Sequence, residues 1–179
     1  MRSFKIYKKN VSPPEDWVVK HFNKIKKGGS VLDMAAGKGR HTQFFLDKGY
    51  NVVAVDQNIT SLSIFNGHPK LRIIKADLET NSHAPFNAGV FNGIVVVNYL
   101  YRPIFQQIIE MLDTGGVLIF QTFMVGNELY GRPRNRNYLL LEDELKNFFG
   151  KELLILDSQQ GYSDRPSKAV TQKICAIKK

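Results

Sequence analysis

The stretch Val31-Leu32-Asp33-Met34-Ala35-Ala36-Gly37-Lys38-Gly39-Arg40 decides the fold of this 179-residue chain. Its apolar start is typical of a buried strand, which we predict over residues 30–35. The small residues after Asp33 keep the following turn tight, so that a ligand can approach the backbone before a helix begins over residues 38–48. In open α/β sheets, ligands bind beyond the carboxyl ends of the strands. The stretch therefore predicts a binding site built on a strand, a glycine turn and a helix.

The same alternation of apolar runs and helical patterns continues along the chain. Further strands are predicted over residues 51–56, 71–76, 93–97, 117–123, 153–158 and 169–177, and helices over residues 14–27, 59–65, 104–112 and 142–149. This order favours a doubly wound, mostly parallel α/β sheet with helices on both faces. Residues 159–166 join the last two strands without a helix, whereas a parallel pair needs a crossover of about a dozen residues. The sheet is therefore predicted to end in an antiparallel hairpin.

Composition restricts the class of protein. Hydrophobic residues make up 43% of the chain and charged residues 23%, which excludes wholesale disorder. The apolar runs fall far short of the roughly 20 residues that cross a bilayer, and the first residues lack the apolar core of a signal peptide. Cys175 is the single cysteine, so an intrachain disulfide is excluded. We expect one domain over residues 1–179 that works in the cytoplasm.

Positive charge is concentrated near the N-terminus. The chain holds 25 Lys and Arg residues against 16 Asp and Glu residues, a formal net charge of +9. Residues 1–30 carry eight of these cations and two of the acids. Such an arm is able to attract nucleic acid, but a solvated lysine face explains the same charge. The composition leaves both interpretations open.

Two further acids stand at the ends of the next strands. Asp56 follows Gly39 by seventeen positions, where a carboxylate is placed to accept both hydroxyls of a ribose. Asp77 comes directly after the third strand and is placed to reach the amino group of a base, with Leu78 packed beside that base. The pattern predicts a nucleoside ligand at this edge of the sheet.

A glycine turn after a strand also occurs in dinucleotide-dependent enzymes. Their fingerprint has a third glycine or alanine at the position where this chain has Thr42. Asp33, ahead of the glycines, would repel a pyrophosphate, but it suits the ammonium group of a nucleoside that carries an amino acid. S-adenosylmethionine is such a ligand, and NAD is disfavoured.

The segment from Asp33 to Gly39, together with Asp56 and Asp77, resembles the motifs of class I S-adenosylmethionine-dependent methyltransferases. The resemblance covers residues 14–177 and implies a Rossmann-like, seven-stranded sheet that ends in an antiparallel hairpin. Two segments resemble small bacterial methyltransferases of the tellurite-resistance-like type, namely residues 93–103 and 126–135. The chain would then comprise a basic arm and helix (1–29), a cofactor-binding core (30–125), and an acceptor-side loop, helix and hairpin (126–179).

The resemblance implies a role for each matching position. Asp33 would hold the ammonium group of S-adenosylmethionine, directly or through water, and Asn98 would contact the amino-acid portion and face the methyl group. His41 lies near this pocket, although a place in the first turn of the helix explains it equally well. The full cofactor-binding set is Asp33, Ala35, Gly37, Gly39, His41, Asp56, Asp77, Leu78 and Asn98.

The acceptor side is defined by residues after the fourth and fifth strands. The candidate catalytic residues are Asn98, Tyr99, Tyr101 and Arg102. The candidate substrate-binding residues Tyr130, Arg132 and Arg134 lie on a loop with three arginines, and guanidinium groups bind carboxylates and phosphates through paired hydrogen bonds. The four histidines lack metal-ligand spacing, so no metal is expected.

We therefore expect methyl transfer to a polar or anionic small molecule by in-line displacement, with the arginine loop as a lid. One alternative is a methyltransferase that acts on RNA or protein through the basic N-terminus. Another is a domain that binds the adenosyl ligand without catalysis, because the binding residues would be the same. The sequence leaves the oligomeric state open, and no membrane partner is expected.

Overall fold

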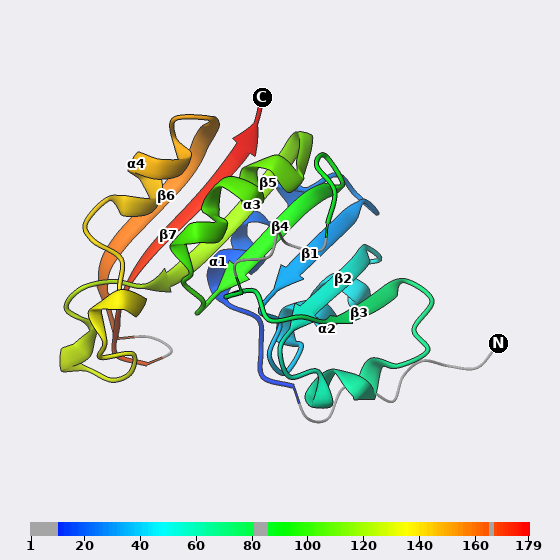
Figure 1. Ribbon diagram of the computed structural model, residues 1–179, viewed down its shortest axis with the longest axis horizontal. Coiled ribbons are helices and arrows are strands. Elements are labelled where there is room, and N and C mark those ends of the chain that lie inside the picture. The colour runs from blue at the N-terminus through cyan, green and yellow to red at the C-terminus, as the bar shows by residue number, and fades with distance from the viewer. Residues whose placement is uncertain (1–10, 81–85, 165–166) are drawn as a thin grey trace.

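The computed structural model describes residues 11–80, 86–164 and 167–179 (Figure 1). The basic residues up to Lys9, and His83, lie outside these ranges. The strands are β1 (Ser30–Met34), β2 (Asn51–Asp56), β3 (Leu71–Lys75), β4 (Phe91–Val97), β5 (Leu112–Phe123), β6 (Leu153–Ser163) and β7 (Ala169–Lys178). The α-helices are α1 (Asp16–His21), α2 (Arg40–Asp47), α3 (Phe105–Met111) and α4 (Glu144–Phe149). Short 3-10 turns are η2 (Phe22–Lys24), η3 (Thr60–Phe65), η4 (Arg102–Ile104), η5 (Asn127–Leu129) and η6 (Arg136–Tyr138).

The strands form one seven-stranded sheet in the order β3-β2-β1-β4-β5-β7-β6. The strands from β3 to β5 in that order are parallel, whereas β7 is antiparallel to both β5 and β6. This confirms the predicted fold and its hairpin. The strand order reverses between β1 and β4, and ligands of doubly wound sheets bind at such a switch point.

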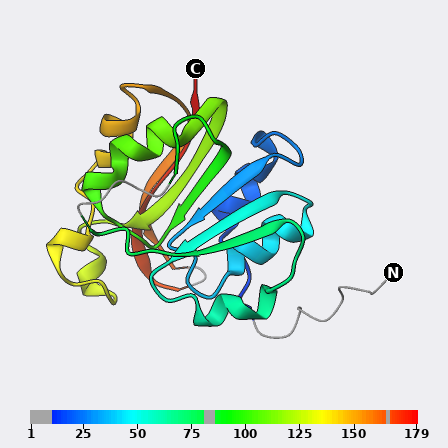
Figure 2. The ribbon, with the colours of Figure 1, turned by 45° about the vertical axis from the view of Figure 1, so that its right-hand side comes forward.

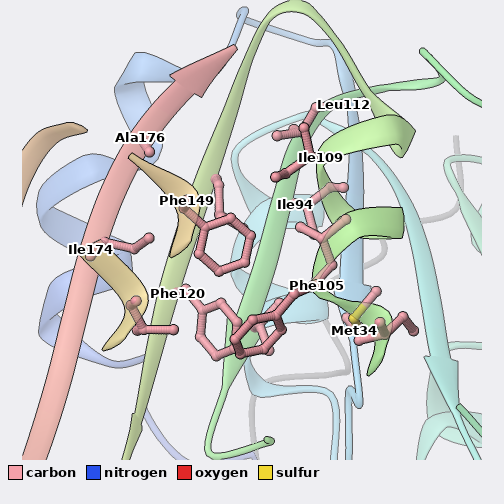
Figure 3. Packing of buried hydrophobic residues seen from close by; sticks show 14 of the residues in the cluster. Met34, Ile94, Phe105, Ile109, Leu112, Phe120, Phe149, Ile174 and Ala176 are labelled. Carbon is pink, nitrogen blue, oxygen red and sulfur yellow. The ribbon is translucent and has the colours of Figure 1, made fainter. Parts of the chain in front are cut away.

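Helices cover both faces of the sheet. Figures 1 and 2 show α3 and α4 on one face, with α1 and α2 on the other. The α3–α4 face holds three large rings, Phe105, Phe120 and Phe149, whose centroids lie 5.1 to 5.9 Å apart (Figure 3). All three side chains are at most 2% exposed, so this aromatic layer anchors both helices to the strands.

Several elements differ in extent from the sequence prediction. The predicted helix over 59–65 is the 3-10 turn η3, and the helix expected over 14–27 is the short α1 followed by η2. The strand predicted over 117–123 begins earlier, at Leu112, because Leu112 already pairs with Phe91 of β4. The register then shifts, and regular pairing continues from Gly93 and Val117. In the described part of the chain, no helix is long and apolar enough to cross a membrane.

A segment that we call the N-terminal strap, residues 11–15, runs along the carboxyl ends of the parallel strands. In Figure 1 it is the dark blue chain that leads into α1. Val11 packs against a small cluster that includes Ala36, Leu62 and Phe65. The strap therefore lies over the edge of the sheet where the switch point places a ligand.

Candidate functional site

The turn after β1 is shaped by three residues in the left-handed region. Ala35, Gly37 and Gly39 have φ values of 54°, 56° and 79°. A Cβ on Gly39 would lie 2.6 Å from the Phe65 ring and 2.8 Å from Leu62 Cδ2, so only glycine fits there. Gly37, in contrast, is exposed and has open space around it. The turn is thus closed on the η3 side and open toward the strand ends.

Asp33 is buried beneath this turn, against the first turn of α2. Its carboxylate is 2% exposed and accepts a hydrogen bond of 2.5 Å from the Thr42 hydroxyl. Burial raises the pKa of Asp33 to about 6, and the hydrogen bonds from Thr42 oppose that shift. Thr42, which occupies the third-glycine position of the dinucleotide pattern, therefore serves as the partner of the buried acid.

Asp56 joins the end of β2 to the glycine turn. One carboxylate oxygen accepts a 2.7 Å hydrogen bond from the Gly37 N–H, and the other accepts a 2.8 Å bond from the Asn58 N–H. Each oxygen keeps lone-pair capacity for a further donor. The structure thus brings together two predicted cofactor residues, Gly37 and Asp56.

A first cleft of about 340 Å³, open to solvent, lies beside Asp56. Two of the predicted cofactor residues, Asp77 and Leu78, line this cleft; Leu78 is buried and Asp77 is exposed. The Tyr99 hydroxyl is buried without a hydrogen-bond partner among the described residues. Burial, with Glu79 and Asp77 nearby, raises the pKa of Tyr99, so its phenol stays protonated. The residues lining the first cleft are Ala35, Asp56, Gln57, Ala76, Asp77, Leu78, Glu79 and Tyr99.

His41 contacts the strap instead of the first cleft. Its Nε2 accepts a 3.2 Å hydrogen bond from the backbone N–H of Glu15. Burial, and then the charge of Arg40, lower the pKa of His41 to about 3, so the ring is neutral and remains an acceptor. The Glu15 carboxylate pairs with Arg40 at 2.9 Å and accepts from Gln121 Nε2 at 3.0 Å. Glu15 therefore ties the strap to α2 and to β5.

A second cleft of about 560 Å³ lies on the α1 side of the same strand ends. Asn98, at the end of β4, is exposed in the left-handed region with φ 57° and lines this cleft. Its neighbour Tyr99 lines the first cleft. The corner at residues 98–99 thus borders both clefts. The residues lining the second cleft are Glu15, Asp16, Trp17, Asn98, Gln121, Phe123, Ser163, Ser167, Ala169, Thr171 and Lys173.

Arg102, a predicted catalytic residue, is occupied by contacts within the protein. Its guanidinium group donates to both oxygens of Glu144 and to the carbonyls of Asn137 and Leu139, the latter two at 2.8 Å. Tyr101 packs against the core on the α3–α4 face. The structure therefore places both side chains away from the linings of the two clefts, and Arg102 instead fixes the loop before α4.

The arginine loop borders the end of the β6–β7 hairpin. The Tyr130 ring packs against the Tyr162 ring at an interplanar angle of 43°, with centroids 4.9 Å apart. Arg132 and Arg134 are exposed, and neither lines the first or the second cleft. Because Tyr162 directly precedes Ser163, a residue of the second cleft, the loop lies beside that cleft rather than within it.

Sequence reasoning did not identify Gln121, Lys173 and Glu15 as residues of a site. Gln121 carried a signal, because it is a polar residue at the carboxyl end of an otherwise apolar strand. The other two carried none, since a strap and an antiparallel strand from distant parts of the chain bring them together. Among the residues that the structure describes, no three His, Cys, Asp or Glu side chains gather as a metal site.

Several solved methyltransferases share this fold. TehB from Haemophilus influenzae superposes with a TM-score of 0.69 at 22% identity, covering 92% of this chain and 62% of that protein. An S-adenosylmethionine-dependent methyltransferase from Methanosarcina mazei gives 0.69 at 15% identity, with 93% and 99% covered. The 1,6-didemethyltoxoflavin-N1-methyltransferase of Burkholderia thailandensis, solved with 1,6-didemethyltoxoflavin and S-adenosylhomocysteine, gives 0.66 at 21% identity, with 90% and 76% covered. The fold is that of the S-adenosylmethionine-dependent methyltransferases.

The family is established by sequence. The model of the tellurite resistance protein TehB family matches residues 3–156. The chain belongs to the TehB family and is a class I S-adenosylmethionine-dependent methyltransferase of TehB-like type. This confirms the resemblance inferred from the glycine turn and its acids. No relative is found among curated proteins.

Proposed function

We propose that this protein transfers the methyl group of S-adenosylmethionine to a polar or anionic small molecule by in-line displacement. The observation that carries the proposal is the corner at residues 98–99, which borders two separate clefts. One cleft would take the methyl donor and the other the acceptor. A displacement needs donor and acceptor held on opposite sides of the transferred group, and ligands bound in two clefts with a shared border would meet that requirement.

The residues of the first cleft fit the adenosyl ligand. Asp56 retains acceptor capacity for ribose hydroxyls, and Asp77 with Leu78 offers a carboxylate and an apolar surface for adenine. The Tyr99 hydroxyl lacks a partner among the described residues, so a polar ligand group would satisfy it. When bound, the ligand supplies a methyl group already activated by its sulfonium.

Asp33 and Arg102 act at a distance from the reacting atoms in this proposal. Asp33 holds the first turn of α2 through Thr42 and attracts the ammonium group of the ligand through water. Arg102 is a positioning residue that holds the loop before α4. Tyr130, Arg132 and Arg134 form a lid beside the second cleft, where two exposed guanidinium groups favour an acidic acceptor.

The ribose contact gives the first test. Asp56→Ala should weaken S-adenosylhomocysteine binding by tenfold or more, since charge-assisted hydrogen bonds to two hydroxyls would be lost, each worth about 1.5–3 kcal/mol. Asp47→Ala, which removes an exposed acid at the far end of α2, is the matched control and should leave the affinity unchanged. Isothermal titration calorimetry measures both variants. Equal affinity in Asp56→Ala and the wild type would refute the ribose assignment, and NAD binding in place of the adenosyl ligand would refute the proposed function.

A further inference from the structure

The floor of the second cleft is a patch of four side chains on two antiparallel strands. Gln121 and Phe123 of β5 lie opposite Lys173 and Thr171 of β7, and all four line the cleft. Alternate residues of a strand share a face, so the four side chains point to the same side of the sheet. The patch therefore joins an apolar ring, a cation, a hydroxyl and an amide within one small surface.

Lys173 is the cation of this patch, and it forms no ion pair within the described ranges. Its Nζ lies 6.0 Å from the centre of the Trp17 ring, which forms part of the cleft wall. The nearby carboxylate of Glu15 is already engaged by Arg40 and Gln121. The exposed carboxylate of Asp16 also lines the cleft, but no ion pair joins it to Lys173 within the described ranges. The ammonium group is therefore available to an anionic ligand.

Gln121 provides a second, independent sign of a ligand. Its side chain is 5% exposed, and its Oε1 has no hydrogen-bond partner among the described residues. Glu15 sets the orientation of the Gln121 side-chain amide. Its carboxylate is paired with Arg40 and is therefore ionised, so it can only accept hydrogen bonds and must face the donor Nε2 of Gln121. A buried carbonyl oxygen that has lost its contact with water and has no other partner is unfavourable. A ligand that donates a hydrogen bond to that oxygen would remove this penalty.

We propose that the second cleft binds the methyl acceptor as a small organic anion that also carries an O–H or N–H group. Lys173 binds the anionic group, Gln121 Oε1 accepts from the donor group, and Phe123 packs against the apolar part. This inference rests on the proposed function for its link to methyl transfer. The binding of such an anion is measurable without turnover, so anion binding and methyl transfer are tested separately.

The probes are 3-hydroxybenzoate, its neutral counterpart 3-hydroxybenzamide, and benzoate, which lacks the hydroxyl donor. Each is titrated by NMR into the full-length protein in the presence of S-adenosylhomocysteine at low salt. We expect 3-hydroxybenzoate to bind about tenfold more tightly than 3-hydroxybenzamide and about fivefold more tightly than benzoate, the effects of one ion pair and one hydrogen bond.

Two variants assign these differences to residues. Lys173→Met should abolish the advantage of the anion over the amide, whereas Lys151→Met, at an exposed lysine on the α4 side, should leave it intact. Gln121→Met should abolish the advantage of 3-hydroxybenzoate over benzoate. Unchanged affinity for S-adenosylhomocysteine in the variants shows that they are folded.

The outcomes separate the two proposals. The inference is overturned if the wild type does not distinguish the anion from the amide, or if Lys151→Met loses the distinction as fully as Lys173→Met. It is also overturned if Gln121→Met keeps the preference for the hydroxyl donor. Failure of the wild type to bind S-adenosylhomocysteine would instead overturn the proposed function, whatever the anion does.

Discussion

The buried carboxylate of Asp33 makes a measurable contribution to the pH dependence of stability. Asp33→Asn removes the titrating group and keeps an oxygen that accepts from the Thr42 hydroxyl. Because the amide of the variant does not titrate, the difference in unfolding free energy between the variant and the wild type isolates the effect of Asp33. Other titrating groups cancel in that difference.

The expected size follows from the pKa of Asp33, which burial raises from 3.8 to about 6. The folded protein then binds this proton more tightly than the unfolded chain, so the wild type loses stability as the pH rises through that interval. A difference of about two pH units at roughly 1.4 kcal/mol per unit corresponds to about 3 kcal/mol. Because pH 4 lies close to the pKa of the unfolded chain, part of this effect falls below pH 4, and the stability of Asp33→Asn relative to the wild type should rise by about 2 kcal/mol between pH 4 and pH 7.

Urea denaturation at intervals of half a pH unit measures this difference, with the slope of the denaturation line checked for constancy in both proteins. A difference that stays flat from pH 4 to pH 7 would show that Asp33 ionises as it does in the unfolded chain. That result would refute the reasoning from burial. A change of the opposite sign would show that the hydrogen bonds from Thr42 outweigh desolvation.

His41→Asn should show the opposite pH trend, because the pKa of His41 is lowered to about 3. The stability of the wild type relative to this variant should fall by about 3 kcal/mol as the pH drops from 7 to 4. A stability difference that does not change with pH in urea denaturation would contradict a buried neutral ring. Gly39→Ala should destabilise the protein by about 1–3 kcal/mol through contact with Phe65 and Leu62, and by more than Gly37→Ala, which meets open space; equal losses in thermal or urea unfolding would refute the close approach. Arg102→Lys should lower stability by about 1 kcal/mol and speed proteolysis within residues 132–138 while leaving S-adenosylhomocysteine affinity unchanged; a large loss of that affinity with normal proteolysis would return Arg102 to the catalytic set.

The part of the site that local sequence encodes was predictable. The turn from Asp33 to Gly39 follows a buried strand, and Asp56 and Asp77 follow the next two, so parallel pairing alone brings them to one edge of the sheet. The hairpin was predictable for a similar reason, since eight residues are too few for a parallel crossover.

The remaining part depends on long-range contacts that have no local pattern. His41 accepts a hydrogen bond from the Glu15 N–H of the strap, and Arg102 forms an ion pair with Glu144. Neither contact has a local sequence pattern. The second cleft is lined by residues of the strap, the start of α1, the ends of β4 and β5, and the β6–β7 hairpin. Its residues are separated by up to 158 positions in sequence, from Glu15 to Lys173, so only the folded sheet reveals that they share a cleft.

The position of β7 between β5 and β6 has a consequence for synthesis on the ribosome. β6 pairs only with β7, so it emerges from the ribosome before any strand exists on which it can add to the sheet. β5 likewise keeps an open edge until the same moment. Lys173 and Thr171 arrive on that late strand, so the floor of the second cleft is completed only when β7 is inserted, after the glycine turn and its acids have left the ribosome. A nascent chain paused before β7 would therefore carry the residues of the first cleft, an open edge on β5, an unpaired β6 and only the β5 half of that floor, a state prone to pair with other chains.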